Sequence, residues 1–157
     1  PRRSGRDSRM PEAQRRIVTA AREQLVRQPG GHGGVLADVR LEGQPAALVL
    51  LAPGAVPDPA GHYRAGDALM VLDVLPAPRP VDRHRFHAAA GVPLYVVVDP
   101  GEGVCTVHSR PLPGAGYREA ERVPFGNDLF LPLGERTLVL ETGDFPTEPP
   151  TPGSAAG

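Results

Sequence analysis

The sequence contains no lysine and no tryptophan, and its one cysteine is Cys105. Because arginine stays protonated, a chain without lysine has no amine that can act as a general base or form a Schiff base. A single cysteine excludes a disulfide within the chain, and this usage is typical of proteins from a reducing compartment. Cys105 lies in an alternating segment with no matched base nearby, so a catalytic thiol is not expected there.

Long apolar runs and a strong net charge are missing as well. No apolar run approaches the roughly 20 residues that a membrane-spanning helix needs, and the arginine-rich start is not followed by the apolar segment of a secretory signal. The formal net charge of −1 disfavours a strongly cationic nucleic-acid-binding module, although it is compatible with a local basic patch. These features predict a cytoplasmic protein.

The 157 residues suit one compact domain with tails, and the 19 glycines and 20 prolines predict many turns. Residues 1–10 carry four arginines without apolar periodicity and are interpreted as a flexible lead-in, with a nucleic-acid-binding arm as the alternative. The domain is expected to span residues 11–146. The Pro- and Gly-rich residues 147–157 are predicted to be a disordered tail.

Residues 68–100 contain the most informative pattern in the chain. Two apolar, β-branched runs, over residues 68–75 and 92–98, flank the short alanine-rich segment 82–90. This order predicts a strand, a crossover helix and a second strand that lies parallel to the first. Runs without polar alternation indicate strands that are buried on both faces.

The rest of the chain predicts one helix and several antiparallel strands. Apolar residues recur at helical spacing after Pro11, and residues 35–41 and 46–51 read as a hairpin. Residues 52–66 are interpreted as a surface loop. Four further strands are expected over residues 104–109, 117–123, 129–131 and 137–140. The predicted class is α/β, with a mixed central sheet, an N-terminal helix, a short crossover helix and a C-terminal antiparallel meander.

Asp73 is the one acidic residue in the first of the two buried runs. A carboxylate among Leu, Met and Val must find a partner, bind a cation or lie at the end of the strand, because uncompensated burial is costly. Two interpretations remain open at this point. Asp73 is either the remnant of a metal site or a carboxylate paired with an arginine such as Arg83 or Arg85.

The segment from Gly91 to Pro100, GVPLYVVVDP, resembles the GVPEYWLVDP hallmark of the Uma family of restriction endonucleases. The preceding residues 72–75, LDVL, resemble the family's VEVL motif, and residues 45–50, PAALVL, resemble its PDVVVV strand. The likeness extends over about residues 11–146. It implies a restriction-endonuclease-like core of the PD-(D/E)XK superfamily, with DNA as the partner and Mg²⁺ as the cofactor.

In active members of that superfamily, an Asp on one strand and a Glu on the next hold a divalent metal that activates water, and a lysine stabilises the developing charge. Here Ala46 occupies the position of the first Asp, and Asp73 that of the Glu. Asp82 resembles the Asp that opens the following helix, but residues 83–85, RHR, stand where the lysine is expected. Leu94 and Val96 replace the Glu and Trp of the hallmark. The resemblance thus implies a degraded metal site, with Mg²⁺ held weakly or lost.

A rebuilt site is the alternative, with Asp73 and Asp38 as metal ligands and Arg85 as the catalytic cation. Asp38 lies on the polar side of the neighbouring predicted strand. Asp58 follows a proline, as the motif requires, but it lies in a predicted loop. His84 and His87 have a spacing that metals use on a helix, although exposed histidines are more often only solvated.

Three functions follow from this pattern. The first is a restriction-endonuclease-like pseudoenzyme that acts by binding. The second is a metal-dependent DNA endonuclease with the rebuilt site. The third is a structural protein-interaction module. A homodimer is expected from the family and from the need to cover the edges of the sheet.

Overall fold

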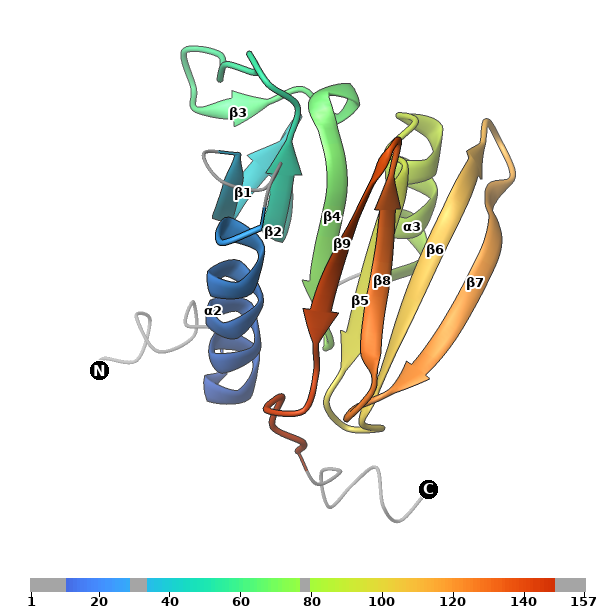
Figure 1. Cartoon of the computed structure of the whole chain (residues 1–157). Helices are drawn as coiled ribbons and strands as arrows, with labels where there is room; N and C mark the ends of the chain where they lie inside the picture. Colours follow the sequence, from blue (N-terminus) through green and yellow to red (C-terminus); the bar gives the residue numbers. More distant parts are fainter. Residues whose placement is uncertain (1–10, 29–33, 77–79, 149–157) are drawn as a thin grey trace, which may run out of the picture.

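The computed structural model describes residues 11–28, 34–76 and 80–148 (Figure 1). The predicted lead-in lies outside the described residues, and so does the predicted tail except for Thr147 and Glu148. The backbone N–H of Glu148 donates to the carbonyl of Pro100 at 2.9 Å. Within the described ranges the protein is α/β, with a mixed seven-stranded sheet and an antiparallel two-stranded sheet, which confirms the predicted class.

The elements follow one another in chain order from α2 to β9. The helices are α2 (Glu12–Val26), the short 3₁₀ helix η1 (Ala65–Asp67) and α3 (Pro80–Ala89). The strands are β1 (Val35–Leu41), β2 (Gln44–Leu51), β3 (His62–Tyr63), β4 (Ala68–Val74), β5 (Leu94–Asp99), β6 (Val104–Leu112), β7 (Gly116–Pro124), β8 (Asp128–Leu133) and β9 (Arg136–Glu141).

The large sheet has the strand order β3-β1-β2-β4-β5-β6-β7. Strands β1, β2 and β4 pair antiparallel, β4 and β5 pair parallel, and β5, β6 and β7 pair antiparallel. The predicted hairpin is therefore β1–β2, and the predicted strand-helix-strand unit is β4–α3–β5. The loop expected over residues 52–66 contains β3, which pairs parallel with β1, and the start of η1.

One face of the large sheet is covered by α2 and by the hairpin of β8 and β9 (Figure 1). The buried stripe of α2 includes Ile17, Ala21 and Leu25, at the spacing that the sequence shows. Strands β8 and β9 form a sheet of their own rather than extending the large one. They alternate, with Leu129 and Leu131 fully buried, so their apolar face has to lie on the core rather than beside β7.

The opposite face carries α3, which packs against β6 and β7. Here a second apolar cluster includes Val49 of β2, Val71 of β4 and Tyr95 of β5, with Phe86 of α3 packed against it. The two faces of the central strands are thus both buried, which explains why β4 and β5 lack polar alternation. In the described ranges, no helix is long and apolar enough to cross a membrane.

Two glutamine side chains cover the edge of β9, namely Gln24 of α2 and Gln28, which lies just beyond the end of α2. Gln28 donates to the Val139 carbonyl at 2.6 Å and accepts from its N–H at 2.8 Å. One helical turn earlier, Gln24 makes the same pair of bonds with Glu141, at 2.9 and 2.7 Å. Each amide therefore acts as the residue of an adjacent strand would, and α2 is registered against β9 by hydrogen bonds as well as by apolar packing.

We expect Gln28→Ala to destabilise the protein by about 2 kcal/mol, because two backbone groups of Val139 lose their partners. Urea denaturation followed by circular dichroism measures this loss. The control is Arg22→Ala, an exposed residue of the neighbouring helix α2, which is expected to change stability by less than about 0.5 kcal/mol. Equal stability of the two variants would contradict a stabilising role for the amide.

Candidate functional site

Asp73 lies near the end of β4, between β2 and β5, and is only 2 % exposed. Its carboxylate accepts three hydrogen bonds. Oδ2 accepts from Arg83 Nη1 at 2.8 Å and from the Tyr95 hydroxyl at 2.9 Å. Oδ1 accepts from the backbone N–H of Ala47 at 3.1 Å. Both oxygens are therefore engaged by protein donors, and the charge is paired with a guanidinium.

Arg83 lies near the start of α3 and is almost fully buried. In addition to Asp73, its Nη1 donates to the carbonyl of Pro45 at 2.8 Å. The Ala47 N–H and the Pro45 carbonyl both belong to the start of β2. One ion pair therefore connects α3, β2 and β4, and Tyr95 adds β5. Removing either charged partner would leave the other buried without compensation.

The sequence left open whether Asp73 pairs with Arg83 or Arg85, and the structure places Arg83 there. Arg85 is exposed on α3. The hydroxyl of Tyr95 is also part of the site, which the sequence pattern does not indicate. The available signal is the strand register: Tyr95 pairs with Val71, two residues before Asp73, so the two side chains lie on the same face of the sheet.

The structure does not bring Asp38 into the bonds around Asp73. Asp38 is exposed on β1, where its backbone has a φ of 57°, and β2 separates β1 from β4. Ala46, at the position where the resemblance expects an Asp, is buried and contributes only a methyl group. Among the described residues, no group of three or more His, Cys, Asp or Glu side chains could hold a metal ion.

Asp58 and Asp99 stabilise turns. Asp58 Oδ1 accepts from the N–H groups of Ala60 and His62, both at 2.9 Å. Asp99 Oδ1 accepts from the N–H groups that follow β5, at 3.0 and 3.2 Å. Carboxylates that bond to the backbone a few residues ahead are typical of Asx turns. This explains the Pro-Asp dipeptide at Asp58 by loop geometry.

Three histidines and two tyrosines gather between α3 and strands β5, β6 and β7. The ring of His84 lies 4.6 Å from that of His108 and 5.2 Å from that of Tyr117, and the ring of His87 lies 4.9 Å from that of Tyr95. The sequence indicated the spacing of His84 and His87 and favoured exposed, solvated side chains, but His87 is fully buried and His84 is half-buried. The packing of the turn at Gly116 is close, since a Cβ there would lie 2.7 Å from His84 Cε1 and the φ of +81° also favours glycine.

Burial controls the protonation of these rings. It lowers the pKa of His87 to about 4, although the nearby Asp73 carboxylate acts in the opposite direction. It also lowers the pKa of His108 to about 4, with a smaller contribution from His84. Burial and then the Asp73 carboxylate raise the pKa of the Tyr95 hydroxyl. At neutral pH the rings are uncharged and Tyr95 remains a hydrogen-bond donor.

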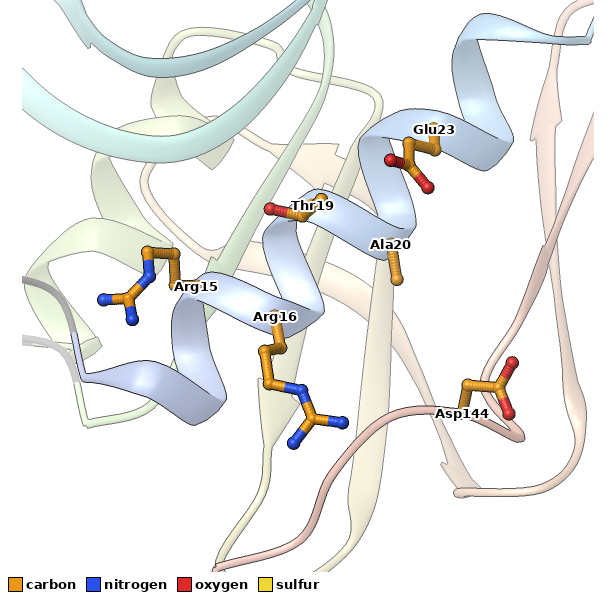
Figure 2. A pocket seen from close by; sticks show the side chains of 6 residues that line it. All are labelled: Arg15, Arg16, Thr19, Ala20, Glu23 and Asp144. Atoms are coloured by element: carbon orange, nitrogen blue, oxygen red, sulfur yellow. The ribbon is translucent and has the colours of Figure 1, made fainter.

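A separate hollow of about 440 Å³ lies beside α2, on the other face of the sheet (Figure 2). Its lining carries charges of both signs, and Arg15 and Arg16 leave the helix in different directions (Figure 2). The lining residues are Arg15, Arg16, Thr19, Ala20, Glu23 and Asp144. None of the residues around Asp73 contributes to it.

No model of a known protein family matches the sequence, and no curated protein matches it. The likeness to the Uma family therefore rests on the motif residues alone.

We expect Asp73→Asn and Arg83→Met each to destabilise the protein by about 3 to 5 kcal/mol, because each leaves a buried partner uncompensated. The double variant should lose clearly less than the sum, since its remaining groups are uncharged. Urea denaturation of the four proteins completes the cycle.

Arg85→Met provides the matched control and should change stability by less than about 0.5 kcal/mol, because its side chain is exposed. Tyr95→Phe offers a milder variant, with an expected loss of about 1 to 2 kcal/mol. Strictly additive losses in the cycle, or an equal loss in Arg85→Met, would contradict the pairing.

Proposed function

We propose that this protein is a catalytically inactive relative of the PD-(D/E)XK nucleases and that it acts by binding. The observation that carries the proposal is that protein donors already bind both carboxylate oxygens of Asp73, the residue at the position of the metal-binding Glu. Its oxygens bond to Arg83, Tyr95 and the Ala47 N–H. A hard cation needs carboxylate oxygens that face it, whereas a guanidinium 2.8 Å from Oδ2 repels such a cation.

The neighbourhood of the two motif strands supports this kinship. In the family, the two acidic residues lie on successive strands and the lysine comes from the helix after the second one. Here the corresponding strands β2 and β4 pair directly, and α3 follows β4. The residues at the three functional positions differ, however. The side chain of Ala46 has no oxygen that could bind a metal. The Asp73 carboxylate is hydrogen-bonded to protein donors, and the positively charged guanidinium of Arg83 pairs directly with it.

The guanidinium of Arg83 therefore takes the place that a divalent cation would need. Both compensate the negative charge of Asp73, but an arginine cannot lower the pKa of a bound water and so cannot generate a hydroxide nucleophile. The alternative, a nuclease with a rebuilt site, requires the carboxylate of Asp38 to reach Asp73 across β2. The exposed position of Asp38 favours the inactive protein.

DNA is the partner that the kinship suggests, and α2 offers positive charge for phosphate contacts. Four arginines of this segment are exposed, namely Arg15, Arg16, Arg22 and Arg27. The buried residues of α2 occupy its other side, so these arginines share the solvent-facing side of the helix. Contacts of this kind bind the backbone without reading the sequence. The homodimer stays a prediction, with β3 and β7 as the two edges of the large sheet.

Supercoiled plasmid incubated with the protein and Mg²⁺ or Mn²⁺ should remain intact, because no metal-activated water forms at Asp73. Agarose gel electrophoresis detects nicking and linearisation. Cleavage that disappears in Asp73→Asn would contradict the proposal and favour the rebuilt nuclease. Cleavage that persists in this variant would indicate a contaminating enzyme, and further purification should remove it.

Fluorescence anisotropy of a labelled DNA duplex tests the binding. With four phosphate contacts, the affinity should fall by about 10²-fold between about 50 and 200 mM salt. The double variant Arg16→Ala/Arg22→Ala should weaken binding and reduce the slope of log affinity against log salt concentration by about 2, because two phosphate contacts are lost. Glu23→Gln on the same helix is the control and should not weaken it. Absence of binding at low salt would contradict DNA as the partner and favour the protein-interaction module.

A further inference from the structure

His87 is the one fully buried imidazole of the described residues, with an exposed fraction of 0 %. Both of its ring nitrogens, Nδ1 and Nε2, lack a hydrogen-bond partner within the described part of the chain. A buried polar group without a partner is costly, and a charged one is far more costly. An apolar side chain would fill the same space without this cost, so the imidazole at this position calls for an explanation.

The groups that face His87 come from every element packed around it. The Asp73 carboxylate lies on β4, the Arg83 guanidinium and the His84 ring on α3, and the Tyr95 ring on β5. Beyond His84 lie the rings of His108 on β6 and Tyr117 on β7, with Arg85 also close enough to affect His84. Asp73 is the single anion among these groups, and Arg83 and Tyr95 already donate to it.

A proton on His87 would therefore find no acceptor. It would also place a positive charge beside Arg83 and His84, and a proton on His108 would do the same beside His84. The fully buried ring of His87 lies in the interface between α3 and the sheet, so it gains access to water only if α3 moves away, whereas His108 is half-buried. Protonation of His87 therefore opposes docking of the helix.

We infer that α3 is a pH-sensitive latch, held against β5–β7 at neutral pH by uncharged histidines and released when they are protonated in mild acid. Because Arg83 belongs to α3, release would also separate it from Asp73 and open the buried carboxylate to solvent. The latch goes beyond the proposed binding function and does not depend on it.

The sign of the effect follows from the pKa values. Burial depresses the pKa of His87 from 6.5 to about 4 in the docked state, so the released state binds more protons in acid. Docking is therefore fully favoured above pH 6.5 and weakens as the pH falls toward about 4. Between about pH 7 and pH 5, protonation of His87 alone should raise the opening constant of α3 by about 25-fold.

Amide hydrogen exchange of the full chain, measured by NMR at about pH 7 and pH 5 and corrected for intrinsic rates, tests the latch. The reporters are the N–H groups of Ala90 and Val92, which bond to Phe86 and His87 at the end of α3. Val71 of β4 reports on global unfolding. We expect the opening constant to rise about 25-fold or more at the α3 reporters and much less at Val71.

His87→Phe keeps an aromatic ring and removes the titrating group, and His87→Met serves if the first variant does not fold. In either variant, the rise in the opening constant of α3 between about pH 7 and pH 5 should be smaller by a factor of about 25. His62→Gln, a half-buried histidine on β3, is the matched control and should leave the response unchanged. A full acid response in the His87 variants, no response in the unmodified protein, or an equal rise at Val71 would each overturn the latch.

Discussion

The structure depends on the compensation of one buried negative charge. Asp73 lies on a central strand that both apolar clusters cover, and water cannot solvate its carboxylate there. Arg83, Tyr95 and the Ala47 N–H replace that water. Because these donors come from α3, β5 and β2, the charge can be buried only when all three elements are in place. The ion pair thus fixes the short helix α3 to the sheet, and it can form only when β2, β4 and β5 are correctly paired.

The same interaction is the basis of the proposal that the protein lacks nuclease activity. Metal-dependent cleavage needs carboxylate oxygens that are free to bind a cation and a water that the cation can activate. An arginine satisfies the charge of Asp73 but offers no site for that water. Position 46 is an alanine and the sequence contains no lysine, so the other two groups that the resemblance would require are absent as well. The exposed side of α2 is rich in arginine, and the proposed binding function rests on this surface.

Much of the fold could be predicted because the periodicity of the sequence reports burial. The two apolar runs correctly predicted strands β4 and β5, and the apolar stripe correctly predicted helix α2. The isolated carboxylate of Asp73 indicated the site. Local pattern could not decide between Arg83 and Arg85, because that choice depends on how α3 is rotated against the sheet. The hydroxyl of Tyr95 and the unpartnered nitrogens of His87 are likewise consequences of packing between distant segments. The same is true of β8 and β9, whose separate sheet depends on the core that they cover.

The central claim is that Asp73 binds an arginine and not a metal. Anomalous X-ray diffraction from crystals soaked in Mn²⁺ tests it most directly, because the ion is located independently of its ligands. We predict no anomalous peak within bonding distance of Asp73, with Arg83 Nη1 remaining hydrogen-bonded to Oδ2. A manganese ion bound to the Asp73 carboxylate, with Arg83 displaced, would contradict the account.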